Sequence, residues 1–156
     1  MRAIRLIADN LRKLFASSPP SDPNRRVRAA NTTRGTVLAS SLEVADTGPA
    51  RNKGLLKRQG LAAGCGLWIV PCQSVHTFFM RFSIDLVYLD GHKRVRKVRT
   101  AVGPGRISFC LTAQSVIELP AGTILQTQTQ RGDTLLIEPC NPCQVDVRGE
   151  CPPNSP

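Results

Sequence analysis

Short segments that are apolar throughout, or that alternate between apolar and polar residues, run along the middle of the chain between glycine- and proline-rich breaks. Residues 84–89, Ile-Asp-Leu-Val-Tyr-Leu, are almost continuously apolar, which indicates a strand buried on both faces. Together with its neighbours this segment predicts a mainly β domain, a small compact barrel or sandwich of about seven short strands with one short helix. The other predicted strands lie at 37–45, 66–70, 75–80, 94–99, 116–119, 124–128 and 134–138.

Three local features interrupt the regular strand pattern. Residues 51–61 are typical of a short helix that turns Leu55 and Leu56 inward. Asp90-Gly91 predicts a tight hairpin with a positive φ at the glycine. In the returning segment 94–99 the valines are three residues apart, so alternation fails and an edge strand or a bulge is expected.

The two ends of the chain differ from this middle region. Met1–Phe15 has apolar residues at helical spacing with arginine and lysine between them, which predicts a basic amphipathic helix. Three prolines in residues 16–23 indicate a linker, and five prolines among the eighteen residues 139–156 indicate a disordered tail. We therefore expect a helix and linker over 1–30, one β domain over 31–138, and then the tail.

The net charge of the chain adds little to this prediction of the fold. The formal net charge is +10, but residues 1–34 contribute eight Arg or Lys against two Asp, so the basic pI is not a property of the β domain. Only 4% of residues are aromatic, which makes a platform for stacked nucleic-acid bases improbable. Nucleic acid is therefore not an expected partner.

The N-terminal pattern also bears on localisation. Its apolar residues are interrupted by charges, so it predicts neither a secretory signal nor a membrane span, and we expect a cytoplasmic protein with reduced cysteines. A basic amphipathic helix suits an anionic membrane surface, so Met1–Phe15 is a candidate peripheral anchor.

Three blocks of sequence resemble a known family. Their order and spacing over residues 31–138 resemble the bacterial and archaeal family called domain of unknown function 192, in a sub-branch with a His-Thr-Phe-Phe-Met-Arg-Phe-Ser-Ile-Asp motif. The resemblance implies a compact β fold with a short helix and implies no activity. The blocks are Arg51-x-x-Gly54-Leu55-Leu56 with Leu61 and Gly64-Cys65-Gly66-Leu67, then His76 to Asp90, then Glu118-Leu119-Pro120-Ala121-Gly122 with Gly132-Asp133.

Two carboxylates stand inside otherwise apolar strands. A buried carboxylate must be paired, hydrogen-bonded or protonated, so Asp85 and Glu118 are candidates for an acid/base pair. The alternative is a structural role, in which each carboxylate binds backbone groups or an arginine such as Arg51 or Arg81.

A second candidate site lies on the predicted strand 75–80. His76 and Met80 are four residues apart, so on a strand they share a face with Phe78, which suits either the floor of a ligand groove or part of the core. With the charged residues of the three blocks, the candidate binding residues are His76, Met80, Arg81, Asp85, Glu118 and Asp133.

The cysteines give little support to metal or nucleophile chemistry. Cys140-x-x-Cys143 is one ligand pair where structural zinc needs four ligands, and Cys151 does not complete the set, so neither a metal nor another cofactor is expected. A Cys65–His76 nucleophile has no further support in the sequence. The chain also has no P-loop, dinucleotide fingerprint, Gly-x-Ser-x-Gly or zinc-protease motif.

These observations favour a non-enzymatic binding or accessory module for a small ligand or a protein segment, in a groove beside the His76–Met80 strand and Glu118. Two alternatives stay open at this point. One is a hydrolase that uses Asp85 and Glu118. The other is a basic domain that docks on an anionic membrane or on nucleic acid, through charges such as the five Lys or Arg between His92 and Arg99.

Overall fold

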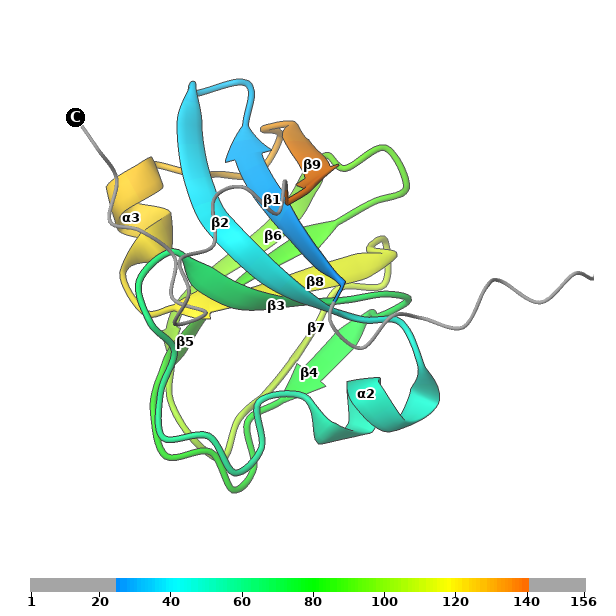
Figure 1. The fold of residues 1–156 in the computed structure, drawn as a ribbon, viewed down its shortest axis with the longest axis vertical. Helices are drawn as coiled ribbons and strands as arrows, with labels where there is room; N and C mark the ends of the chain where they lie inside the picture. The colour runs from blue at the N-terminus through cyan, green and yellow to red at the C-terminus, as the bar shows by residue number, and fades with distance from the viewer. Residues whose placement is uncertain (1–24, 141–156) are drawn as a thin grey trace, which may run out of the picture.

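The computed structural model describes residues 25–140, which form a curled seven-stranded sheet and a separate two-stranded sheet (Figure 1). This confirms the mainly β class, and the large sheet is a half-barrel rather than a sandwich. The elements are β1 (Arg26–Asn31), β2 (Thr36–Ala45), α2 (Gly48–Lys53), β3 (Cys65–Ile69), β4 (Ser74–His76), β5 (Ile84–Leu89), β6 (Val95–Val102), β7 (Ile107–Phe109), β8 (Ser115–Pro120), α3 (Thr123–Thr127) and β9 (Leu135–Pro139).

The large sheet has the order β6-β5-β8-β3-β2-β1-β9, and β4 pairs with β7 in the small one. Neighbouring strands are antiparallel except β2 and β3, whose parallel connection contains α2. The sheet curls until its two ends meet at one corner, where an isolated bridge joins Arg94 to Thr134 and the Val95 N–H donates to the Asp133 carbonyl at 2.8 Å. The curl therefore brings β6 and β9, the two edges, together.

Apolar residues fall into two clusters, one on each face of the large sheet. Strand β5 serves both, because all six of its residues are buried and alternate residues point to opposite faces. Val87 belongs to the cluster that includes Ile124 of α3, and Leu86 belongs to the cluster that includes Val75 of β4 and Leu55. The prediction of a strand buried on both faces is confirmed.

The segment Ile124–Gln128 was predicted as a strand and is a helix, so that prediction is wrong. Helix α3 begins after Gly122, whose φ of 95° only glycine adopts readily, and the Ile124 N–H donates to Asp85 Oδ2 at 2.8 Å. A distant carboxylate thus satisfies one of the helix's free N-terminal donors. The local sequence Ile-Leu-Gln-Thr-Gln at 124–128 carries no signal of that contact.

The helix predicted at 51–61 occurs earlier and is shorter. It begins with Thr47 as N-cap, whose Oγ1 accepts from the Ala50 N–H at 3.3 Å, and it ends at Gly54. Leu55 is still buried, but it lies in the turns that follow the helix. Thr47 and Pro49 were the start signals, since proline favours the first turn of a helix.

Strand β4 ends at His76, four residues before the predicted end of that strand. The chain then turns, because the Met80 N–H donates to the Thr77 carbonyl at 3.3 Å and Phe79 takes a φ of 64°. His76 and Met80 therefore do not share a strand face, and Phe78 is on the surface whereas Met80 is buried. The predicted common face is wrong.

The hairpin between β5 and β6 is also wider than predicted. Asp90 Oδ1 accepts from the backbone N–H groups of His92 and Arg94, both at 3.0 Å, and the positive φ of 61° falls on Lys93 rather than on Gly91. The expected edge position and bulge are both present, since β6 lies at the end of the sheet and its pairing with β5 shifts register twice.

The fold begins before the expected boundary at residue 31. Strand β1 pairs with β2 on one side and β9 on the other, and Val27 and Ala29 are part of the core. The predicted helix at Met1–Phe15 and the Pro-rich tail lie outside the described residues. Between residues 25 and 140, no helix is both long enough and apolar enough to cross a bilayer.

Candidate functional site

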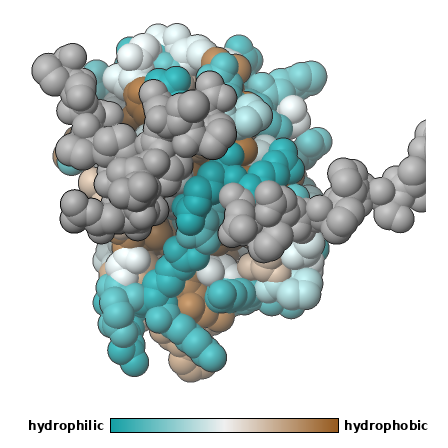
Figure 2. Space-filling model, viewed as in Figure 1, coloured by the Kyte–Doolittle hydropathy of each residue, from teal (hydrophilic) through white to brown (hydrophobic). Residues whose placement is uncertain are grey.

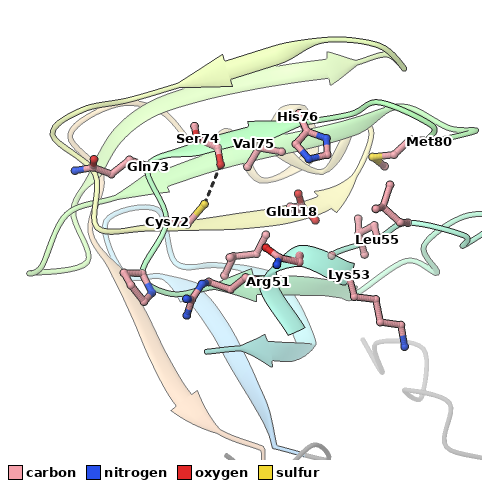
Figure 3. A pocket seen from close by; sticks show the side chains of 15 residues that line it. Arg51, Lys53, Leu55, Cys72, Gln73, Ser74, Val75, His76, Met80 and Glu118 are labelled. Carbon is pink, nitrogen blue, oxygen red and sulfur yellow. Dashed lines mark hydrogen bonds between the residues drawn. The ribbon is translucent and has the colours of Figure 1, made fainter. Parts of the chain in front are cut away.

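A pocket of about 350 Å³ opens between α2, β4 and the middle of β8. Figure 3 shows the Glu118 side chain in the gap between the Ser74–His76 strand and the Arg51–Leu55 segment. The volume lies at the small end of the range for ligand sites. The lining residues are Arg51, Asn52, Lys53, Gly54, Leu55, Leu56, Ile69, Pro71, Cys72, Gln73, Ser74, Val75, His76, Met80 and Glu118.

Glu118 is the central polar group of this pocket. It lies in β8, where the register places it between Leu67 of β3 and Leu86 of β5. Its side chain is buried, with the residue only 4% exposed, and its Oε2 has no hydrogen-bond partner among the described residues. Burial raises the pKa of this carboxyl from 4.5 to about 7, and the positive charge of Arg58 partly opposes that rise.

Arg58 is held in place by a different carboxylate. Its two terminal nitrogens donate to the two oxygens of Glu43, at 2.9 and 2.6 Å, and this bidentate pair lowers the pKa of Glu43. Glu43 lies opposite Leu67, so the row across the sheet reads Glu118, Leu67, Glu43. Arg58 therefore forms its ion pair with Glu43, and its positive charge acts on Glu118 only at longer range.

The apolar wall comes from segments far apart in the sequence. Leu55 follows α2, Val75 lies in β4 and Met80 lies in the turn after β4, and all three are buried in the cluster on this face of the sheet. His76 stands beside them with its ring stacked on Phe78 at a centroid distance of 5.5 Å. The pocket thus has one apolar wall and a carboxyl at its base.

The opposite end of the pocket is basic. Arg51 Nη1 donates to the Asp46 carbonyl at 2.8 Å, which fixes this side chain beside the loop. Burial raises the pKa of the Cys72 thiol, and the charge of Glu118 raises it further whereas that of Arg51 lowers it. The charges of Glu118 and Arg51 therefore both act on the Cys72 thiol, in opposite directions.

Asp85 is not part of this site. Its two oxygens accept from the backbone N–H groups of Ala101 and Ile124, each at 2.8 Å, and the residue is fully buried. It pairs with Leu119 in the register, whereas Glu118 pairs with Leu86, so the two carboxylates point to opposite faces of the sheet. They cannot act together on one bound molecule.

Asp133 and Arg81 also lie away from the pocket. Asp133 Oδ2 accepts from Asn31 Nδ2 at 2.8 Å and from Arg34 Nε at 3.1 Å. Burial alone would raise the pKa of Asp133, but these hydrogen bonds lower it. The aspartate ties the β1–β2 turn to the start of β9, so its position is structural. Arg81 is exposed and contacts Gln59 at 3.4 Å.

The structure therefore brings His76, Met80 and Glu118 together at one pocket and places Arg81, Asp85 and Asp133 elsewhere. The sequence analysis did not select Arg51 and Leu55, although the first family block, Arg51-x-x-Gly54-Leu55-Leu56, contains both. That block was the available signal. The sequence carried no such signal for Cys72 and Glu43, because a loop places Cys72 at the pocket and strand pairing places Glu43 beside Leu67. No cluster of three metal-ligating side chains occurs within residues 25–140.

The fold and this pocket define a small β domain with a curled sheet and, on one face, a cleft that has a buried carboxyl at its base. The chain belongs to the family domain of unknown function 192, described as uncharacterized ACR, whose profile matches residues 29–137. Among its relatives are the UPF0127 protein TK1120 of Thermococcus kodakarensis, 29% identical over 110 residues, and a UPF0127 protein of Thermococcus gammatolerans, 31% identical over 110 residues. These alignments cover 67% of this chain and 69% and 71% of the relatives.

Two solved structures have the same fold. One is a candidate transcription regulator from Sinorhizobium meliloti 1021, with a TM-score of 0.63 and 21% identity over 72% of this chain and 92% of the other. The second is a protein of unknown function from Novosphingobium aromaticivorans, with a TM-score of 0.60 and 18% identity over 78% and 94% of the two chains. At this identity the similarity concerns the fold alone.

Proposed function

We propose that this protein is a non-enzymatic binding module that takes a small ligand in the Glu118 pocket. The ligand would present an N–H group, best an ammonium, to the Glu118 carboxyl and an apolar body to Leu55 and Met80. The observation that carries this proposal is the buried Glu118 Oε2, which has no partner among the described residues although it lines a pocket. An unpaired buried acceptor is costly, and a ligand donor would remove that cost.

An ammonium is preferred over a neutral group on electrostatic grounds. Burial raises the pKa of Glu118 because it disfavours the charged carboxylate, and a cation beside the carboxylate would restore the charged form. Arg58 does so only in part, since its charge is paired with Glu43 in a bidentate contact. The binding alternative is preferred over the hydrolase because Asp85 faces the other side of the sheet.

The test uses butylamine as the probe and backbone amide NMR shifts as the measurement. We expect butylamine to shift the amides of Leu55, Val75 and Glu118, with an affinity that rises as pH passes upward through about 7, where Glu118 ionises. Butanol, which has the same apolar chain and no charge, should bind about tenfold more weakly, the scale of one charge-assisted hydrogen bond.

Two variants sharpen the result. Glu118→Gln keeps the size of the side chain and removes its charge, so it should lose the preference for butylamine. Glu138→Gln makes the same chemical change on the exposed strand β9 and should bind as the wild type does. Shifts that are scattered over the surface, or that are the same in Glu118→Gln, would show that the carboxyl does not hold the ligand.

A further inference from the structure

A second surface, which borders the pocket at His76, exposes large apolar side chains. Phe79 is 90% exposed, Leu111 76%, Ile107 63%, Phe109 59% and Phe78 41%. We call these five residues the phenylalanine face. Three of the four phenylalanines between residues 25 and 140 lie on it, although phenylalanine is a residue that proteins usually bury. Such a concentration of exposed apolar residues indicates an interaction surface.

The small sheet creates this face by strand alternation. Val75 and Ser108 are paired and point inward, so their neighbours Ile107 and Phe109 point outward. His76 lies opposite Ile107 and stacks on Phe78, which joins the strand residues to the following turn. In Figure 2 apolar residues reach the surface at the lower end of the molecule, between hydrophilic side chains.

Phe79 occupies the tip of this surface in a fixed turn. Its φ of 64° lies in the left-handed region, which is unfavourable for a bulky residue. The turn is held by Thr77, whose Oγ1 donates to the Gly103 carbonyl at 2.7 Å and accepts from the Arg106 N–H at 2.9 Å. The fold thus presents a phenylalanine to solvent from a backbone that hydrogen bonds keep in place.

The charges around the face have one sign. The segments 71–84 and 103–115, which build the small sheet and its turns, contain Arg81 and Arg106 and no Asp or Glu. Lys97 reaches across from β6, with its Nζ 5.4 Å from the centroid of the Phe109 ring and 2.7 Å from the Phe109 carbonyl. The partner of an apolar face with these neighbours must therefore be anionic at its surface and apolar beneath it.

Charge also argues against two other occupants. The N-terminal segment Met1–Phe15 has apolar residues that could cover the face, but it carries Arg2, Arg5, Arg12 and Lys13 against one Asp. A second copy of the chain would bring the same arginines together. Like charges across an interface oppose association.

We propose that the phenylalanine face docks on an anionic lipid surface, with Phe79 inserted among the headgroups and Arg81, Arg106 and Lys97 above the phosphates. Aromatic residues enter the interface of a bilayer, and each basic residue near an anionic surface adds electrostatic attraction. A protruding tip suits a fluid surface, which closes around it without a matching cavity.

The test measures co-sedimentation of the full chain with vesicles of phosphatidylcholine and phosphatidylglycerol, compared with phosphatidylcholine alone. We expect binding only to the anionic vesicles, a decrease of about tenfold in Phe79→Ser, and a further loss in Phe79→Ser with Arg106→Glu. The matched control is Leu125→Ser, which removes another strongly exposed apolar side chain, 79% exposed, from α3. It should bind as the wild type does.

A fluorescent variant reports the insertion itself. Phe79→Trp should shift its emission to shorter wavelength on anionic vesicles and be quenched by brominated lipid, whereas the buried Trp68 supplies a constant background. Equal vesicle binding by wild type and Phe79→Ser overturns the proposal and assigns any binding to another part of the chain. Failure to bind vesicles overturns it too, and leaves an acidic protein as the partner of this face.

Discussion

Asp85 and Glu118 lie on adjacent strands of one sheet, one register position apart, and point to opposite faces. Both are buried carboxylates in apolar strands, yet their surroundings differ completely. Asp85 has both oxygens bonded to backbone N–H groups, whereas Glu118 has an oxygen without a partner among residues 25–140. Asp85 is therefore used by the backbone of the fold, whereas Glu118 is a polar group of the pocket.

Substitution of Asp85 should destabilise the protein severely. Asp85→Ala leaves the buried N–H of Ile124 and the part-buried N–H of Ala101 without their acceptor, so the free energy of unfolding should fall by about 2–4 kcal/mol. Urea denaturation measures the change, with Glu138→Gln as a control of little effect. An unchanged midpoint would mean that α3 does not depend on this carboxylate.

Glu118 should make stability depend on pH between about 4.5 and 7. Over that range the unfolded carboxyl ionises while the folded one stays protonated, so stability present at low pH is lost as pH rises through the folded pKa of about 7. The loss should approach 3 kcal/mol, since each pKa unit corresponds to about 1.4 kcal/mol.

The comparison of wild type with Glu118→Gln isolates this effect, because groups common to both proteins cancel. Glu43 and Asp133 have pKa values below their ordinary values of 4.5 and 3.8. Their effect on stability therefore changes with pH below the range from 4.5 to 7. Parallel stability curves for the two proteins from pH 4.5 to 7 would contradict a raised pKa at Glu118.

Gly66 should not tolerate a side chain. A Cβ there would lie 2.5 Å from the Glu118 carbonyl oxygen and 2.7 Å from Leu42 Cδ2, so β8 would have to move. Gly66→Ala should destabilise by about 2–3 kcal/mol, the scale of overpacking. Gly60→Ala is the matched control, since nothing lies within 4 Å of its Cβ, and thermal melting should separate the two clearly.

The domain should tolerate truncation to residues 25–140 but not to 32–140. The longer form keeps β1, which pairs with β2 and β9 and buries Val27 and Ala29. It should melt cooperatively within about 5 °C of the full chain. The shorter form should lose its cooperative transition, and a sharp melt of residues 32–140 would show that β1 is dispensable.

The local pattern of apolar residues was sufficient to predict strands where burial and the two-residue period of a strand agree. The segments 37–45, 66–70 and 84–89 are strands in the structure within one residue at each end, because each must bury one or both faces. The hydrophobic pattern wrongly predicted a strand at 124–128. A helix forms there because Asp85 accepts from its N-terminal N–H group and the preceding Gly122 adopts a left-handed conformation. The pattern also missed β1 and β7, whose short or charged sequences are stabilised by pairing with other strands.

The sequence by itself determined the mainly β class, the family and the presence of two carboxylates that could not be ordinary core residues. Only the tertiary structure decided which carboxylate faces a pocket, because the register of β5 against β8 sets the side to which each points. The pocket likewise exists only after α2, β4 and β8 come together from three parts of the chain. The exposure of Phe79 depends on a turn fixed by Thr77 and a loop some 26 residues away, which no local pattern contains.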